Sequence, residues 1–383
     1  MSDSPPRLLS DLLTNVGQAS TDRRTFLGRA SLGLVIGGSA LVGCRGEESD
    51  GDAKARSAAA GTATPRRGAR SQNANSKLDT ALHAPEDHEM GAALAGAEEA
   101  ARADELRRYA PELPPLSNER TLRLNWRAQE VPVRIGTDTV VAGWTFEGDI
   151  PGPIVHCRVG DTVEFTLTNE GAIAHSMDFH AAQIDPKVAF RSVAQGQSIT
   201  FKFQPKWAGA FMYHCGTAAV LMHIGAGMYG AIIVSPREPL PDAREFVLVQ
   251  SEYYLGEEED GVRAFDYTKM LSTLPDLVVF NGRPNQYVDA PIRVKVGDRV
   301  RFWLVNAGPT HSCSFHVVGE QFDTVYLGAP PTSPLRGIQT WGVAPGGGTC
   351  MELVCDIPGK FPFVNHGFGH GQKGAIGFLV VEA

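Results

Sequence analysis

Most of the chain after residue 122 consists of short runs in which apolar and polar residues alternate. Gly, Pro, Asn and Asp separate these runs at short intervals. An alternation with a period of two is typical of β-strands that bury one face, and closely spaced turn residues favour an all-β sandwich or barrel. We therefore predict an all-β fold for this part of the chain.

Two pairs of segments repeat in the same order within this region. The segment VGDTVEFTLTNEGAIAHSMDFH, residues 159–180, is echoed by VGDRVRFWLVNAGPTHSCSFH, residues 296–316. Further along, GAFMYHC at residues 209–215 is echoed by GKFPFVNHG at residues 359–367. Because both echoes keep one order with only small gaps, they indicate a duplicated domain rather than a short repeat array.

The boundary between the two β-domains is predicted near residues 235–242, where Pro and charged residues cluster in SPREPLPD. The first domain is then expected to span residues 119–238, and the second residues 239–383.

The residues before the first β-domain have a different composition. No Phe, Tyr or Trp occurs between Leu27 and Arg108, and this stretch is rich in Ala, Gly, Ser and charge. Such a composition buries too little apolar surface to offset the conformational entropy lost on folding. We interpret residues 45–118 as a flexible linker with one helix at residues 89–109, where helix formers and an apolar stripe occur.

Residues 1–44 have the features of an export signal. Arg23 and Arg24 precede an apolar run over residues 30–43, which is too short to span a bilayer comfortably. This pattern is similar to a twin-arginine signal, and LVGC, which ends at Cys44, is similar to a lipoprotein cleavage site. We expect an exported protein, periplasmic or at the cell surface, with a lipid anchor on Cys44. Cleavage without lipidation and an uncleaved apolar helix are the alternatives.

Composition and charge narrow the range of partners. The chain of 383 residues is 43% hydrophobic and 20% charged, which is usual for globular proteins, and it is long enough for two domains. Its formal net charge of -8 argues against a nucleic acid as the partner, and no basic run is interleaved with aromatic residues. A small diffusible substrate is the simpler expectation.

The chain contains six cysteines, of which Cys44 belongs to the signal and Cys215 adjoins a histidine. An oxidising compartment would permit disulfides among the other four, which are Cys157, Cys313, Cys350 and Cys355. A bridge between Cys350 and Cys355 is disfavoured, because residues five apart on a strand face opposite sides.

Four residues have the chemistry of an electron-transfer metal site. They offer a thiolate, two imidazoles and a weak thioether, the ligand set of a blue-copper centre, and they are His175, Cys215, His223 and Met228. Three of them share a compact loop with the spacing Cys-x7-His-x4-Met. Core packing would explain any one of them alone, but not all four in this order. We therefore predict a type 1 copper site.

The alternation of side chains on a strand predicts a second metal site. His214 and Cys215 are adjacent and so point to opposite faces, and His175 and His180 diverge in the same way. The second domain carries His366 at the position of His214. Three imidazoles, from His180, His214 and His366, with a displaceable water would form an open catalytic site for copper or zinc. The peptide link from His214 to Cys215 favours redox-active copper.

Asp178 and His316 are candidates for proton delivery at this second metal. Asp178 shares the strand face of His180, and His316 is the echo of His180 in the second domain. A carboxylate and an imidazole beside an open metal site suit general acid catalysis. The alternatives are a capping carboxylate and a histidine that is bonded at a domain interface.

The second domain lacks a blue-copper thiolate of its own, because Gly367 stands in place of the cysteine. His311 echoes His175 without that partner. We interpret His311, and likewise His370 and His156, as structural residues.

The motifs HSMDFH, YHC, HIGAGMYGAIIVSPRE, PDLVVFNG, FHVVG and FVNH resemble those of the copper-containing nitrite reductases, relatives of the two-domain multicopper oxidases. The resemblance covers residues 120–383. It implies two tandem cupredoxin-like Greek-key β-barrels and assembly as a homotrimer. It also implies that the type 2 copper lies at the subunit interface, where His180 and His214 of one subunit and His366 of its neighbour bind it.

The resemblance implies further residue roles. Asp178 and His316 would be the paired proton donors, Val318 the apolar residue over the substrate position, and Thr340 a support for the histidine.

The chain departs from the usual pattern of this family in three places. The loop between Cys215 and His223 is one residue shorter than is typical, Gln339 stands in place of an acid, and the segment after His366 is shortened.

The implied activity is that of an oxidoreductase, a nitrite reductase of denitrification that forms nitric oxide by a one-electron reduction. Each subunit would hold a type 1 and a type 2 copper. A small protein, either a cupredoxin or a cytochrome c, would donate the electron.

Two alternatives from other classes stay open. A laccase-like two-domain multicopper oxidase would reduce oxygen at a larger copper cluster. Of the 11 histidines, His83 and His88 lie in the linker and two are assigned to blue copper, so the seven that remain are too few for that cluster. In addition, Gly216 stands where a His-Cys-His motif needs its second histidine. The other alternative is a non-enzymatic electron carrier or copper-binding lipoprotein.

Overall fold

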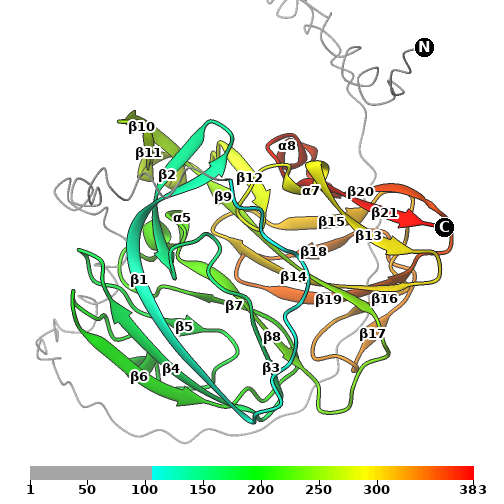
Figure 1. Ribbon diagram of the computed structural model, residues 1–383, viewed down its shortest axis with the longest axis horizontal. Coiled ribbons are helices and arrows are strands. Elements are labelled where there is room, and N and C mark those ends of the chain that lie inside the picture. The colour runs from blue at the N-terminus through cyan, green and yellow to red at the C-terminus, as the bar shows by residue number, and fades with distance from the viewer. Residues whose placement is uncertain (1–105) are drawn as a thin grey trace, which may run out of the picture. The chain divides into compact units, whose positions relative to one another are not determined.

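The computed structural model describes residues 106–383 (Figure 1). The predicted signal, the lipid-attachment site and nearly all of the predicted linker and helix lie outside these residues. The last part of that helix, residues 106–109, is described, and its backbone is irregular, so the helix prediction is wrong there. The reason is that the backbone N–H of Tyr109 donates to Gln286, and its carbonyl accepts from the Tyr287 hydroxyl.

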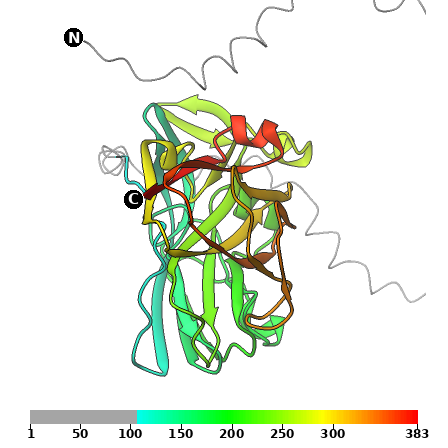
Figure 2. The same cartoon turned by 90° about the vertical axis from the view of Figure 1, so that its right-hand side faces the viewer.

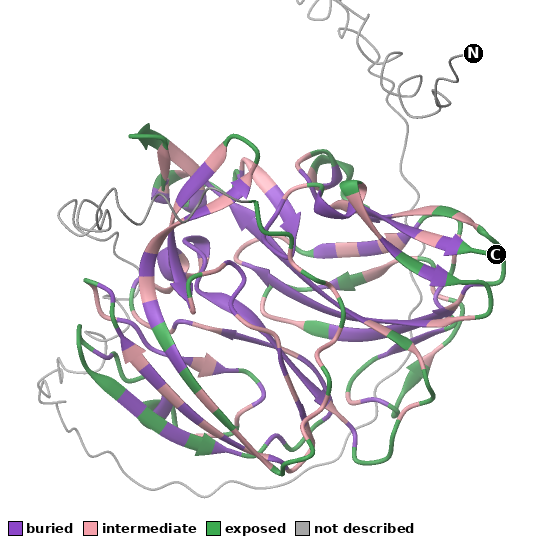
Figure 3. Ribbon diagram, in the orientation of Figure 1, coloured by how far each residue is buried: buried purple, intermediate pink, exposed green. Residues whose placement is uncertain are grey.

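Eight strands build the first β-sandwich. One sheet has the order β2-β1-β4-β6, formed by β1 (Thr121–Gly136), β2 (Thr139–Phe146), β4 (Thr162–Asn169) and β6 (Ser198–Phe203). The facing sheet has the order β3-β8-β7-β5, formed by β3 (Val155–Arg158), β5 (Asp178–Phe179), β7 (Gly209–His214) and β8 (Tyr229–Ser235). Buried positions alternate with partly buried ones along β4 and with exposed ones along β6 (Figure 3), which agrees with the pattern in the sequence.

The second sandwich repeats this plan with extra strands at one side. Its first sheet has the order β12-β9-β14-β19-β16-β17, formed by β9 (Arg244–Tyr253), β12 (Leu277–Phe280), β14 (Arg299–Gly308), β16 (Thr324–Tyr326), β17 (Pro334–Leu335) and β19 (Gly348–Val354). The other has the order β13-β21-β20-β15-β18, formed by β13 (Ala290–Lys295), β15 (Cys313–Val317), β18 (Trp341–Val343), β20 (Gly359–Asn365) and β21 (Ile376–Glu382).

The equivalent strands pair in equivalent ways. β1 runs parallel to β4 as β9 runs parallel to β14, and β3 runs parallel to β8 as β13 runs parallel to β21. The prediction of an all-β fold with two cupredoxin-like units is therefore confirmed, and the grouping of strands is also visible after a 90° turn (Figure 2). The domain limits of 119–238 and 239–383 stay predictions.

The repeated Val-Gly-Asp motif forms the same turn in both units. Gly160 and Gly297 have φ angles of 77° and 89°, a conformation that favours glycine. The carboxylates of Asp161 and Asp298 each accept a hydrogen bond from a backbone N–H three residues earlier, both at 2.8 Å. The sequence echo thus has a local structural cause.

One hairpin extends across the predicted boundary. β10 (Leu255–Glu259) and β11 (Val262–Phe265) follow the boundary in the sequence, yet β11 lies beside β2 through a pairing of Arg263 with Val141 (Figure 1). A segment assigned to the second domain therefore extends a sheet of the first.

The helices of residues 106–383 are short and follow strands or turns. They are α4 (Pro186–Ala189), α5 (Val220–Gly225), α6 (Tyr267–Leu271), α7 (Gln286–Asp289) and α8 (Phe368–Gln372). Helix α5 follows β7, and α8 follows β20 at the equivalent place in the second unit. Within the described residues, no helix has the length and apolar character needed to cross a bilayer.

Aromatic rings fill the core of each unit. Trp126 on β1 packs against the rings of four residues, Phe146, Phe165, Phe179 and Tyr213. The two units also contact each other, with β7 packed against β14 and β19. At this contact Arg283, which is 3% exposed, pairs with Asp149 at 2.6 Å.

All five cysteines of residues 106–383 are buried and free. The disulfides that an oxidising compartment would permit are therefore not formed within this part of the chain.

Candidate metal centres

Three buried donor groups converge in the first unit. The Sγ atom of Cys215, which follows β7, lies 3.3 Å from the Nδ1 atom of His223 on α5. The Nδ1 atoms of His175 and His223 also lie 3.3 Å apart. These three side chains form a group that could hold a metal ion, and each is at least nine-tenths buried. A thiolate with two imidazoles suits copper better than a hard cation.

Backbone hydrogen bonds place Met228 beside these donors. The Cys215 N–H donates to the Met228 carbonyl at 3.1 Å, and the Met228 N–H donates to the His223 carbonyl at 3.0 Å. Met228 is fully buried. The structure therefore brings together all four residues that the sequence predicted for type 1 copper.

The charges of this cluster favour the thiolate. Burial alone would raise the pKa of Cys215, but the imidazoles of His223 and His175 hold that pKa well below its usual value. Burial alone would lower the pKa of His175, but Cys215 and Glu130 raise it to about 9. Because the thiolate is the form that binds metal, this cluster suits a soft cation.

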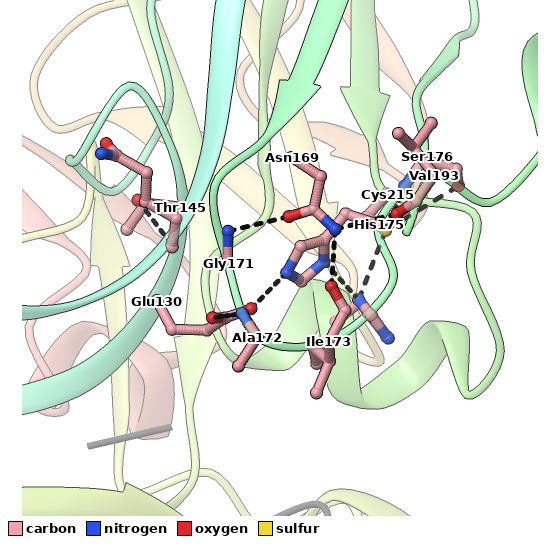
Figure 4. Close-up of polar contacts among 12 residues, drawn as sticks. Glu130, Thr145, Asn169, Gly171, Ala172, Ile173, His175, Ser176, Val193 and Cys215 are labelled. Atoms are coloured by element: carbon pink, nitrogen blue, oxygen red, sulfur yellow. Dashed lines mark hydrogen bonds and ion pairs between the residues drawn. The ribbon is translucent and has the colours of Figure 1, made fainter. Parts of the chain in front are cut away.

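Glu130 is a residue that the sequence reasoning missed. Its carboxylate lies 2.6 Å from the Nε2 atom of His175 and also accepts from the Ala172 N–H (Figure 4). Glu130 is 7% exposed and shares the inward face of β1 with Trp126 and Ala128. A charged residue at an inward position of an alternating strand is a signal that could have identified it.

Two further residues support this cluster. The Asn169 side chain donates to the carbonyls of Ile173 and Val193 and so holds the loop that carries His175 (Figure 4). The ring of Trp144 lies 4.8 Å from that of His223, measured between centroids.

A second cluster lies on the opposite side of β7. The Nε2 atoms of His180 and His214 are 3.0 Å apart, and the Asp178 carboxylate lies 3.7 Å from the first and 3.5 Å from the second. The side chains of Asp178, His180 and His214 are 19%, 33% and 13% exposed. His214 and Cys215 thus belong to different clusters, as strand alternation predicted.

The hydrogen bonds of the two imidazoles leave their Nε2 atoms for a metal. The Nδ1 atom of His180 lies 3.0 Å from the Gly346 carbonyl, and the Nδ1 atom of His214 lies 2.8 Å from the Cys215 carbonyl. A carbonyl only accepts, so each Nδ1 carries the proton and each Nε2 lone pair points into the cluster. This arrangement fits an open metal site of the predicted kind.

Burial shifts the titration of this cluster. Burial raises the pKa of Asp178, and the charges of His214 and His180 oppose this shift. Burial also lowers the pKa of His180, and the charge of His214 lowers it further. A neutral imidazole is the form that binds a metal.

His316 and His366 form a separate pair on the second unit. Their ring centroids lie 5.5 Å apart, and His366 is exposed. Neither belongs to the group of Asp178, His180 and His214 within the same chain. The structure of one chain therefore does not bring His366 to the other two predicted ligands, nor His316 to Asp178.

The support of His316 does not need an acidic side chain. Its Nδ1 atom lies 2.5 Å from the backbone carbonyl of Gln339, which any residue at this position could provide. Thr340 follows Gln339, and Val318, which is 41% exposed, follows the strand that carries His316.

His156 has the structural role that the sequence suggested. Its Nδ1 atom lies 2.6 Å from the Pro114 carbonyl, and its Nε2 atom lies 2.8 Å from the hydroxyl of Ser235 at the end of β8.

The chain is similar to known copper proteins in sequence and in structure. A family model described as multicopper oxidase matches residues 127–239. A copper-containing nitrite reductase of Neisseria meningitidis is 36% identical over 290 residues, covering 73% of this chain and 75% of that protein. One from Cereibacter sphaeroides is 31% identical over 294 residues, covering 70% of this chain and 77% of that protein.

The solved copper nitrite reductase of Nitrosomonas europaea superposes with a TM-score of 0.64 at 35% identity, covering 68% of this chain and 94% of that one. The copper nitrite reductase of Thermus scotoductus gives a TM-score of 0.63 at 29% identity, covering 68% of this chain and 62% of that one. The chain therefore belongs to the copper-containing nitrite reductase family, and it is an oxidoreductase whose metal is copper.

Proposed function

We propose that this enzyme reduces nitrite to nitric oxide at two copper centres with different roles. The observation that carries the proposal is the pair of donor clusters on opposite sides of β7, joined by the consecutive residues His214 and Cys215. A chain with a single electron-carrying site would have no need of the second, partly exposed cluster.

Each cluster suits one role. A copper ion held by the four buried donors would accept an electron, and one held by the exposed imidazoles would bind nitrite and reduce it. The buried donors are His175, Cys215, His223 and Met228, and the exposed ones are His180, His214 and the His366 of a neighbouring subunit. The peptide bond between His214 and Cys215 gives the electron a covalent route of one residue.

Asp178 and His316 would supply the protons. Conversion of nitrite to nitric oxide takes up one electron and two protons, breaks one N–O bond and releases the oxygen as water. The burial that raises the pKa of Asp178 helps its carboxyl to hold a proton beside the Nε2 atoms of His180 and His214. The Gln339 carbonyl holds Nδ1 of His316, so Nε2 is left to face the substrate.

We further propose a homotrimer in which the catalytic copper lies between subunits. Within one chain, the pair of His316 and His366 is separate from the cluster of Asp178, His180 and His214. Each group is solvent-accessible and incomplete, so a neighbouring copy can supply what each lacks.

The proposed location and electron donor are supported by the signal-like N-terminal sequence and by the family resemblance. We propose export, with a lipid anchor at Cys44, and a small cupredoxin or cytochrome c as the electron donor.

The similarity to multicopper oxidases favours one other activity. A solved multicopper oxidase superposes with a TM-score of 0.61 at 29% identity, covering 68% of this chain and 89% of that one. A laccase-like enzyme would oxidise phenols or metal ions and reduce oxygen. The shortage of histidines speaks against it.

One experiment separates these functions. The purified, copper-loaded protein is mixed anaerobically with a reduced dye and nitrite, and nitric oxide is measured together with the copper content. We expect nitric oxide and at least two copper ions per chain, and a Cys215→Ser variant should lose the reaction. Oxygen uptake with a phenol, without nitric oxide from nitrite, would instead support the oxidase.

A further inference from the structure

The second unit has a pair of histidines at the position that corresponds to the buried donor cluster of the first unit. His311 occupies the place of His175 in the repeat, and His370 lies on α8, which follows β20 as α5 follows β7. The ring centroids of His311 and His370 are 4.8 Å apart, and those of His175 and His223 are 5.2 Å apart. The two imidazole pairs are thus spaced alike.

The surroundings of His311 also repeat those of His175. The Asn306 side chain donates to the carbonyls of His311 and Val343, both at 2.9 Å, and Asn306 has the place that Asn169 has in the first unit. The Nε2 atom of His311 lies 2.8 Å from the Thr273 carbonyl. Because that carbonyl accepts the Nε2 proton, the Nδ1 lone pair of His311 stays available.

A buried carboxylate lies beneath the pair. Strand β1 pairs Ala128 with Asn169, and β9 pairs Gln250 with Asn306, so Glu252 is the counterpart of Glu130. Glu252 is 1% exposed and accepts from the His311 N–H at 2.7 Å. It provides negative charge next to the imidazoles.

Gly367, which stands in the place of Cys215, lies beside His370. A Cβ atom at Gly367 would lie 3.3 Å from the Nδ1 atom of His370. In the first unit, the Cys215 sulfur lies 3.3 Å from the Nδ1 atom of His223. The second unit therefore has two imidazoles, a supporting Asn and a buried carboxylate, and it lacks both sulfur donors of the first, since Gly367 and Ala375 stand in the places of Cys215 and Met228.

We propose that His311 and His370 form a further metal site, which takes a divalent cation such as Zn²⁺, Co²⁺ or Cu²⁺ through two imidazoles and water. This site is additional to the two copper centres and does not rest on the proposed function. Without a thiolate it binds more weakly than the buried cluster of the first unit. An ion at Nδ1 of His370 would also replace the hydrogen bond from Asn365, which is 3.1 Å long.

The charges around His370 are compatible with this role. Burial, then the charge of His311, and also that of Lys373 lower the pKa of His370, while Glu252 opposes them. Lys373 itself donates to the Pro275 carbonyl. His370 is thus neutral at pH 7, which is the form that binds a metal.

The first test uses the holoprotein with its copper content measured beforehand. Zn²⁺ is titrated by equilibrium dialysis and calorimetry. We expect one additional ion per chain in the unmodified protein and at least a tenfold weaker binding in His311→Gln and His370→Gln. His156→Gln, which removes a partly buried histidine elsewhere, is the matched control and should bind as the unmodified protein does. No additional ion, or equal binding by all variants, would overturn the proposal.

A second test restores one of the missing sulfur donors. Gly367 has a φ of -68°, which any residue can adopt, and the side chains of Asn365 and His370, each 3.3 Å from an added Cβ atom, must shift slightly to admit a cysteine. In a Cys215→Ser background, which removes the first thiolate, Gly367→Cys should give a visible Cu²⁺–thiolate absorption that disappears when His370→Gln is added. A colourless Gly367→Cys protein that is folded by circular dichroism would contradict a shared coordination sphere. Neither test uses nitrite turnover, so neither depends on catalysis.

Discussion

At the scale of single residues, a buried carboxylate orients the proposed electron-transfer ligands. The Glu130 carboxylate is hydrogen-bonded to Nε2 of His175, and this bond leaves Nδ1 directed at Cys215 and His223. Hydrogen bonds of this kind from a second layer of residues fix the tautomer and orientation of a metal-binding imidazole. Glu130 therefore contributes both to stability and to the shape of the site.

We predict that Glu130→Gln destabilises the copper-free protein by roughly 1–3 kcal/mol at pH 7, because a charge-assisted buried hydrogen bond is weakened. Denaturant unfolding measures the change. Glu170→Gln is the control, since Glu170 is exposed and its carboxylate accepts from the Gln129 side chain at the surface. Equal unfolding free energies for Glu130→Gln and the unmodified protein would argue against this role.

The stabilisation that Glu130 provides should also depend on pH. Burial alone would raise the pKa of Glu130, but the hydrogen bond with His175 and that with the Ala172 N–H hold it below the usual 4.5. The unfolded chain therefore takes up this proton first, and the stabilisation is complete above 4.5 and lost as the pH falls through the lower folded value. The stability difference between the two proteins should shrink on acidification below 4.5; a difference that grew would contradict the sign.

Asp178 is one of the two proposed proton donors. We expect Asp178→Asn to lower the nitrite turnover by about a hundredfold or more, because an amide cannot donate the required proton. The blue absorption should persist, since Asp178 lies outside the buried cluster. Asp185→Asn, which changes a cap of α4, is the control and should keep the turnover. Full turnover by Asp178→Asn would remove this residue from the mechanism.

At the scale of elements, β7 connects the two proposed copper centres and β1 supports it. Alternation on β7 directs His214 to the partly exposed cluster, and Cys215, the next residue, belongs to the buried one. The inward face of β1 carries both Trp126 and Glu130. Core packing and ligand support thus come from one strand.

We predict that Trp126→Ala costs roughly 3–5 kcal/mol of unfolding free energy, because a ring in contact with four others leaves a cavity. The neighbouring Arg127→Ala is the control. Its side chain is 49% exposed and pairs with Glu147, so we expect a change below about 1 kcal/mol. Urea unfolding monitored by fluorescence and circular dichroism measures both. Similar losses for the two variants would show that the inward face of β1 does not carry the stability.

At the scale of the whole molecule, one chain contains the two halves of the proposed catalytic site in separate places. Asp178, His180 and His214 lie on the first unit, and His316 and His366 lie on the second. The assembly of copies, and not the fold of one chain, would therefore complete the site.

Mixing two inactive variants tests this arrangement. His180→Ala and His366→Ala should each lack nitrite turnover and still sediment as trimers. When the two are unfolded, mixed and refolded together, some interfaces combine an intact His180 with an intact His366, and part of the turnover should return. A mixture that sediments as trimers and stays inactive would contradict a site shared between subunits.

The sequence was sufficient where the information is local. Strand alternation separated His214 from Cys215, and the repeat identified two β-units and the shared turn at Gly160 and Gly297. The spacing of Cys215, His223 and Met228 placed them on one loop. Each of these inferences depends on residues a few positions apart, or on internal similarity, so no knowledge of packing was needed.

Contacts between distant segments were decided only by the tertiary structure. Glu130 reaches His175 from a different strand, β11 joins β2 across the predicted domain boundary, and His366 lies with His316 rather than with His214. The His311 and His370 pair, taken as structural from the sequence, also became a candidate metal site only through its spacing and support. Periodicity records which face of an element is buried, but it does not record which other element covers that face.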